Sequence, residues 1–188
     1  MTLRDPAPPS QSEALGLWEK AVKQMDQGNW QEAREALEGA LAVEPDHPGS
    51  LNKLGVCLVE TGDVAGAEVM FQKALEVDPK MAQAHSNLGN IELTRGNAAA
   101  ARDEYLEALK MDPDYSLAHH NLSAAYKRLG EIDKAVAELK KARSLESQQG
   151  RPAGYAAPDT SQPAKSRFGC LFWLVILGIM IAIIMTLR

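Results

Sequence analysis

The chain has 188 residues, a formal net charge of −5 and 45% hydrophobic residues, which indicates one folded domain with room for additional segments. This overall charge gives no support for nucleic-acid binding, which would call for a basic face, so we expect no nucleic-acid partner. Its two cysteines, Cys57 and Cys170, are far apart in the sequence and are not expected to pair, which argues against a disulfide scaffold and fits a reducing compartment.

The first segment, residues 1–13, is predicted to be a disordered lead. It reads MTLRDPAPPSQSE, with three prolines and no apolar run. Because a secretory signal needs an apolar core segment, we expect this lead not to be one. The folded domain is therefore expected to begin at residue 14.

Residues 14–147 carry an internal repeat with a period of 34. Prolines recur at this spacing, at Pro45, Pro79 and Pro113. Five further columns share the period: Gly28/Gly62/Gly96/Gly130, Ala33/Ala67/Ala101/Ala135, Ala40/Ala74/Ala108/Ala142, Leu37/Phe71/Tyr105/Leu139 and Ala21/Gly55/Gly89/Ser123. Such a period indicates stacked repeats, each of which buries its apolar face only against its neighbours. The small columns allow helices to approach closely, so Gly55 and Gly89 are interpreted as packing glycines.

The second copy predicts two helices joined by a turn. The first helix is expected over 48–61, followed by Gly62 in the left-handed conformation that ends helices. Asp63 is the expected N-cap of a second helix over 64–77, because its side chain can accept from a free N–H. The same capping position holds Asn29, Asn97 and Glu131 in the other copies. Asp78-Pro79 then closes the copy, since the residue before proline avoids the helical conformation.

This pattern resembles the tetratricopeptide repeat (TPR) family. The resemblance rests on LNKLGVCL at 51–58, AHSNLGNI at 84–91, AGAEVMFQKALEVDP at 65–79 and AARDEYLEALKMDP at 100–113. It implies an all-α, right-handed solenoid of four helix-turn-helix repeats, at 14–47, 48–81, 82–115 and 116–147. The first copy departs from the family with Lys20-Ala21, and the fourth with Ser123 and no closing proline.

The end of the chain predicts a membrane anchor. Residues 148–167 are rich in Gly, Pro, Ser and Ala and are interpreted as a flexible linker. Phe168–Leu187 is uncharged, and a helix of this length spans about 30 Å, the thickness of a bilayer core. We therefore expect a single-pass, tail-anchored protein whose repeats lie on the cytoplasmic side of a bacterial inner membrane or a eukaryotic organelle. Cys170, at the bilayer edge, is a weak candidate for acylation.

No constellation of catalytic residues is found. The four histidines, His47, His85, His119 and His120, have no metal-binding spacing, and neither cysteine has a base beside it in the sequence. We therefore predict that the chain is not an enzyme and that it carries no cofactor and no metal.

The family resemblance implies a concave groove lined by the first helix of each copy. Its candidate peptide-binding residues are Trp18, Asn52, Lys53, Val56, Asn87, Asn90, His120, Asn121, Lys127 and Arg128. Asparagine amides both donate and accept, which suits the backbone of an extended peptide, and the basic residues suit an acidic group or a C-terminal carboxylate. The predicted function is a membrane-tethered scaffold that binds protein or peptide partners.

Two alternatives remain open at this point. The first is a self-associating scaffold, a homo-oligomer formed through an apolar edge of the fourth copy at Ile132, Val136, Leu139 and Leu145. The second is an accessory or assembly subunit of a membrane complex. The copies also differ in charge, with net charges of −4, −2, −3 and +2 in chain order. This polarity suggests that the basic fourth copy faces anionic lipid.

Overall fold

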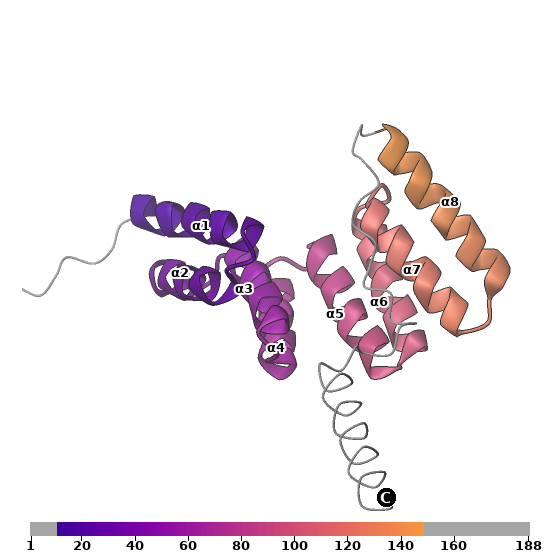
Figure 1. Cartoon of the computed structure of the whole chain (residues 1–188), viewed down its shortest axis with the longest axis horizontal. Helices are drawn as coiled ribbons and strands as arrows, with labels where there is room; N and C mark the ends of the chain where they lie inside the picture. The colour runs from indigo at the N-terminus through magenta and orange to yellow at the C-terminus, as the bar shows by residue number, and fades with distance from the viewer. Residues whose placement is uncertain (1–10, 149–188) are drawn as a thin grey trace, which may run out of the picture. The chain divides into compact units, whose positions relative to one another are not determined.

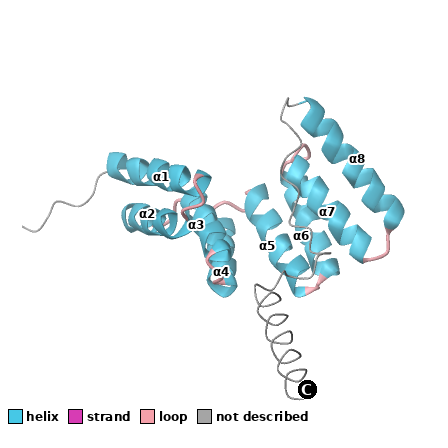
Figure 2. Ribbon diagram, viewed as in Figure 1, coloured by secondary structure: helices cyan, strands magenta, loops and turns pink. Residues whose placement is uncertain are grey.

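The computed structural model describes residues 11–148. All regular structure within 11–148 is helical (Figure 2). The helices are α1 (Gln11–Asp26), α2 (Trp30–Val43), α3 (Pro48–Glu60), α4 (Val64–Val77), α5 (Ala82–Arg95), α6 (Ala98–Met111), α7 (Ser116–Arg128) and α8 (Ile132–Gln148).

Several sequence predictions fall on other parts of the chain. The linker from residue 149 onward and the anchor Phe168–Leu187 with Cys170 lie outside the described residues. None of the helices within 11–148 has the length and apolar character needed to cross a bilayer. Helix α1 begins at Gln11, so it includes the last residues of the predicted disordered lead.

The eight helices form four consecutive pairs. Within each pair the two helices pack along each other, and the second helix of a pair packs against the first helix of the next (Figure 1). The first helices also touch one another directly, α3 with α5 and α5 with α7. This arrangement confirms the predicted all-helical stack of helix-turn-helix repeats, and it places α3, α5 and α7 side by side.

The helix ends follow the predicted turn chemistry in most positions. Gly28, Gly62, Gly96 and Gly130 all have positive φ, between 76° and 93°, which a glycine adopts without strain. Helix α4 covers the predicted 64–77, and its N-cap Asp63 accepts a hydrogen bond from the Gly66 N–H at 2.9 Å.

The predicted capping role of Asn29 and Asn97 is wrong. Both residues occupy the N-cap position, but neither side chain accepts a capping hydrogen bond. Instead, the Asn29 amide donates to Gln24 Oε1 at 2.7 Å and the Asn97 amide donates to Glu92 Oε2 at 2.8 Å. The side chains thus tie the turn back to the preceding helix.

The core confirms the predicted role of the packing glycines. Phe71 and Tyr105 are almost completely buried, and each ring lies against a glycine of the preceding helix, Gly55 and Gly89 respectively. A Cβ on either glycine would lie within 2.6 Å of a ring carbon. Cys57 is a free, fully buried thiol in the same core cluster as Phe71.

The apolar edge of the last helix is narrower than the sequence predicts. Ile132 and Val136 are exposed, at 55% and 45%, whereas Leu139 is half-buried and Leu145 is buried at 5%. Leu145 belongs to the core because α8 extends to Gln148 and packs along α7.

Candidate functional site

The predicted groove residues all lie on the first helices of the four pairs. Trp18 is on α1; Asn52, Lys53 and Val56 are on α3; Asn87 and Asn90 are on α5; His120, Asn121, Lys127 and Arg128 are on α7. The first helices of the last three pairs contact one another, so residues from different repeats lie close together.

The four asparagines form hydrogen bonds between neighbouring repeats. The Asn87 amide donates to Asn52 Oδ1 at 3.0 Å, which joins α5 to α3. Asn90 Oδ1 accepts from the Asn121 amide at 2.9 Å and from the Tyr105 hydroxyl at 2.7 Å, which joins α5 to α7 and α6. A row of amides therefore connects three repeats across one surface.

This network leaves part of the hydrogen-bonding capacity unused. Within the described residues, Asn87 Oδ1 has no donor, and the amide N–H groups of Asn52 and Asn90 have no acceptor. Asn90 is exposed and Asn52 and Asn87 are half-buried, whereas Asn121 is buried at 4%. Asn52, Asn87 and Asn90 can therefore still bind a ligand, while Asn121 acts mainly between helices.

A cavity of about 190 Å³ opens beside this row of amides. Its apolar lining comes from α3, α4 and α5, and its polar lining includes two of the asparagines. The residues are Val56, Val59, Glu60, Val64, Phe71, Asn87, Asn90, Ile91 and Thr94. An apolar floor with a few convergent polar groups is typical of sites that hold one side chain of a ligand.

Trp18 and Lys53 are also brought together. The Lys53 ammonium lies 5.6 Å from the centroid of the Trp18 ring, within the range of a cation–π interaction between α3 and α1. Lys53 is therefore half-buried against the indole rather than fully extended into solvent.

The predicted residues of α7 are only partly joined to the others. Arg128 donates to the Leu93 carbonyl of α5, so it links the last two repeats. Within residues 11–148, the side chains of His120 and Lys127 form no hydrogen bond or ion pair with the other predicted residues. Lys127 and Arg128 are both exposed at the end of α7, where they remain a predicted site for an acidic group.

The remaining histidines and the cysteine serve structural contacts. His85 and His119 hold the same column in successive repeats, and each ring bonds a glutamate of the following helix, Glu104 at 2.9 Å and Glu138 at 2.6 Å. Burial raises the pKa of the Cys57 thiol to about 11, so this group is not a ready nucleophile. Within residues 11–148 no cluster of three or more His, Cys, Asp or Glu side chains is placed to hold a metal.

Tyr105 bonds to the row of amides, although the repeat pattern does not single it out. The pattern assigns it only to the space between helices, but its hydroxyl orients the Asn90 amide. The column that holds Tyr105 contains Leu37, Phe71 and Leu139 in the other copies. A hydroxyl in only one copy of an otherwise apolar column is the available signal, because a buried phenol needs a polar partner.

Comparison with protein families identifies the repeats. Models described as tetratricopeptide repeat match residues 24–91 and 117–149, and one described as TPR repeat matches residues 89–130. No curated protein sequence is significantly similar to this chain.

Solved structures show the same fold. A thermophilic TPR protein of Thermus thermophilus, TTC0263, has a TM-score of 0.65 and 24% identity, covering 71% of this chain and 75% of its own. MamA has a TM-score of 0.62 and 23% identity, and the match covers 73% of this chain and 80% of MamA. The first TPR of Spaghetti (RPAP3), solved with the HSP90 peptide SRMEEVD, has a TM-score of 0.60 and 21% identity. The match covers 66% of this chain and 99% of that structure's chain. Residues 24–149 of this chain are therefore tetratricopeptide repeats.

Proposed function

We propose that this chain is a protein-interaction scaffold that binds an extended peptide segment of a partner protein across α3 and α5. The proposal rests chiefly on the unused amide groups of Asn52, Asn87 and Asn90 beside the 190 Å³ apolar cavity. An extended backbone presents N–H and C=O groups alternately, and these amides supply both matching acceptors and donors. The cavity then takes one aliphatic side chain of the ligand.

The ligand is expected to differ from the peptide bound by Spaghetti. Chaperone-binding TPR domains that this chain resembles grip a C-terminal carboxylate with Lys, Asn and Arg in five columns. Here those columns hold Asn52, Val56, Asn87, Leu117 and Asn121, and only Asn87 fits. Counting the columns from the first copy gives no match. The peptide SRMEEVD is therefore a negative control for binding.

A pair of matched substitutions tests the proposed groove. Val59 and Val69 are both exposed, at 38% and 46%, but only Val59 lines the cavity. Partners captured by the full chain should be lost with Val59→Asp, because a carboxylate then lies in the apolar cavity, and retained with Val69→Asp. Equal loss in both variants, or loss in neither, would contradict groove binding.

We further propose that Phe168–Leu187 anchors the repeats to a membrane, with the repeats on the cytoplasmic side. The support is the 20-residue uncharged sequence, with Lys165 and Arg167 before it. The full chain should stay in the membrane fraction after carbonate extraction, and a chain ending at residue 167 should be released. Protection of the repeats from added protease in sealed, cytoplasm-side-out vesicles would reverse the proposed orientation.

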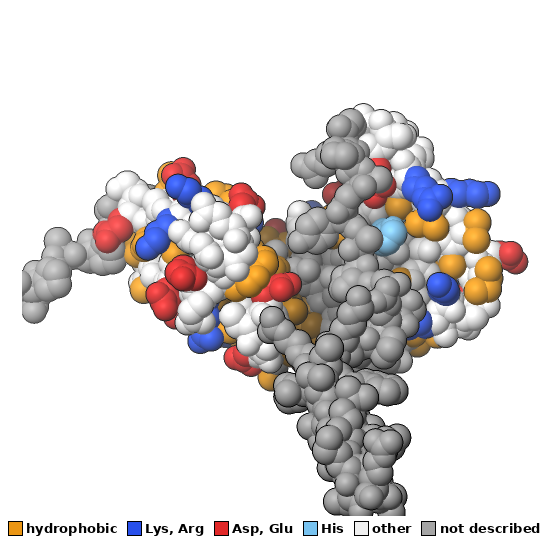
Figure 3. All heavy atoms as spheres, in the orientation of Figure 1, with side chains coloured by type: hydrophobic (Ala, Val, Ile, Leu, Met, Phe, Trp, Pro, Cys, Tyr) orange, Lys and Arg blue, Asp and Glu red, His pale blue; other side chains and the backbone are white. Residues whose placement is uncertain are grey.

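Self-association is a second candidate function, favoured by the exposure of Ile132 and Val136 on α8. Figure 3 shows exposed hydrophobic side chains together with Lys and Arg on the surface of this helix. Light scattering of the full chain in detergent should give a dimer mass that falls to a monomer with Ile132→Lys. A monomer mass for the unsubstituted chain would remove this candidate.

A further inference from the structure

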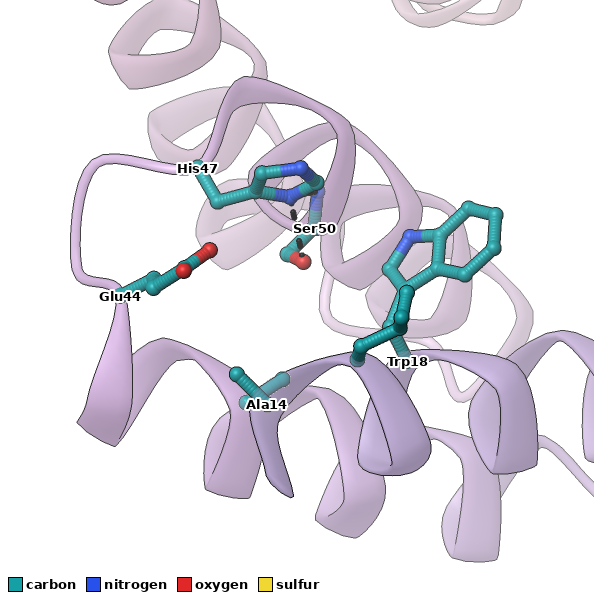
Figure 4. Close-up of a pocket in the computed structure, with 7 residues that line it drawn as sticks. Ala14, Trp18, Glu44, His47 and Ser50 are labelled. Atoms are coloured by element: carbon teal, nitrogen blue, oxygen red, sulfur yellow. Dashed lines mark hydrogen bonds between the residues drawn. The ribbon is translucent and has the colours of Figure 1, made fainter. Parts of the chain in front are cut away.

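A second cavity, of about 280 Å³, lies apart from the row of amides, where α1, the end of α2 and the start of α3 meet. Ala14, Leu15 and Trp18 line it from α1, Ala40 and Glu44 from the end of α2, and His47 and Ser50 from the start of α3 (Figure 4). Its wall is partly apolar, and Leu15 is 58% exposed at its mouth. The cavity therefore has room for a side chain with a long aliphatic part.

The indole of Trp18 leaves an unpaired donor at this cavity. Its Nε1 is buried and has no hydrogen-bond partner among the described residues. In Figure 4 the nitrogen edge of the indole faces the side of the cavity where Ser50 and His47 lie. A buried donor without an acceptor costs free energy, and a ligand carbonyl would remove that cost.

The carboxylate of Glu44 supplies a negative charge on the wall of this cavity. Glu44 is half-buried on the cavity wall and has no ion-pair partner within residues 11–148. His47 forms no ion pair with Glu44, and its Nδ1 accepts from the Ser50 N–H at 3.0 Å. The surrounding repeat has a net charge of −4, which favours a cation, whereas the Lys53 ammonium, 5.6 Å from the Trp18 ring centroid, opposes one on the face of the indole that it covers.

We propose that this cavity binds a basic side chain, lysine or arginine, of the peptide ligand. The aliphatic stem lies against Leu15 and the Trp18 ring, and the cationic head pairs with Glu44. A backbone carbonyl of the ligand accepts from Trp18 Nε1. This inference rests on the proposed function, since the basic residue belongs to the peptide that crosses α3 and α5.

The position of the cavity gives the ligand a direction. A basic residue would be held at the first repeat, and the exposed Lys127 lies in the last repeat, beyond the amides. A segment with a basic residue at one end and an acidic group at the other then fits in one orientation only, because the reverse orientation juxtaposes like charges.

The test uses three small probes with the full chain in detergent micelles: the N-acetyl, N′-methylamide derivatives of lysine, norleucine and glutamate. The ¹H–¹⁵N cross-peak of the Trp18 indole is assigned by its loss in Trp18→Phe. The lysine probe should shift this peak saturably, and more tightly than the norleucine probe of the same stem length. Equal binding of both, or preference for the glutamate probe, would overturn the proposal.

Two substitutions separate the charge of Glu44 from that of the repeat as a whole. Glu44→Gln keeps the shape and should weaken the lysine probe by about threefold, as expected for a partly exposed ion pair. Glu35→Gln removes the same charge from an exposed residue of α2 that does not line the cavity, and should leave binding unchanged. If both variants weaken the binding of the lysine probe equally, the effect comes from the net charge of the repeat, which would contradict the proposed ion pair between the probe and Glu44.

The peptide-groove proposal and the proposal for this cavity can be tested independently of each other. Val59→Asp should abolish partner capture and leave the lysine-probe shift intact, since the two cavities share no residue. If the probe binds but partner capture does not depend on Val59, the cavity stands and the groove proposal falls. If capture depends on Val59 but no probe shifts the Trp18 peak, the cavity proposal falls alone.

Discussion

Replacing Gly55 by alanine tests the packing that holds each repeat together. A Cβ on Gly55 would lie 2.5, 2.7 and 2.9 Å from the ring carbons Cε1, Cδ1 and Cζ of Phe71. Phe71 is only 1% exposed, so its ring can move only by displacing other core residues. Overpacking of this kind costs about 1–3 kcal/mol. Alanine recovers about 1 kcal/mol of that through its higher helix propensity than glycine.

The expected result is a fall of up to about 2 kcal/mol in the free energy of unfolding for Gly55→Ala. Gly16 is the matched control: it lies inside α1, and a Cβ there meets nothing within 4 Å. Gly16→Ala should therefore raise the free energy of unfolding by about 0.5–1 kcal/mol. Urea denaturation followed by circular dichroism measures both. If both variants are stabilised equally, the steric argument is refuted.

A second substitution should rescue the first. The first repeat has Ala21 and Leu37 in the columns of Gly55 and Phe71, and both are fully buried. The glycines thus stand opposite aromatic rings, and larger residues stand opposite leucine. In the Phe71→Leu background, Gly55→Ala should cost at least about 1 kcal/mol less than it does alone, since contacting residues couple by about 0.5–3 kcal/mol. Strict additivity of the two substitutions would contradict the pairing.

Three further predictions follow from buried groups. Ala101 is fully buried, so Ala101→Leu should lower the free energy of unfolding by about 1–3 kcal/mol, measured by the same denaturation. Cys57 has a pKa of about 11 instead of the ordinary 9, so the unfolded chain ionises first and the free energy of unfolding should fall as the pH rises from about 9 to 11; native Cys57 should also resist a thiol reagent until unfolding. His119 bonds both Glu138 and the Pro113 carbonyl, so His119→Ala should cost about 1–3 kcal/mol, more than the equivalent His85→Ala, whose ring has one described partner.

The helix ends were predictable where the conformation of a residue is determined by its immediate neighbours in the sequence. Gly62 adopts a positive φ of 93°, and Asp63 caps α4 through the Gly66 N–H. Both depend only on residues within a few positions along the chain. These local determinants are why the bounds of α4 agree with the prediction to the residue. The 34-residue period extends the same expectation to the turns of the other copies.

Asn29 and Asn97 show where that transfer fails. Five residues before each lies a side chain that can accept, Gln24 and Glu92, and an amide can donate to it. The residue five before Asp63 is Leu58, and a carboxylate has no proton to donate. The capping position therefore has two outcomes. The column alone does not decide between them, because the decision depends on a neighbour from the preceding helix.

The positions of the candidate site residues were predictable from the repeat, but the hydrogen-bonding groups that they leave free for a ligand were not. Placing the asparagines on the first helices needs only the period, whereas their free groups depend on contacts made 31 and 35 residues away. Asn121 uses its amide to bond Asn90 and is buried, so binding capacity concentrates on α3 and α5 instead of spreading evenly along the stack. The Tyr105 hydroxyl reinforces this because it donates to Asn90 Oδ1, so the N–H groups of the Asn90 amide are the part of that side chain left to bind a ligand. The second and third repeats should therefore be the most selective for the backbone and side chains of a ligand, and the two ends of the stack should select for the charge of the ligand residues that lie there.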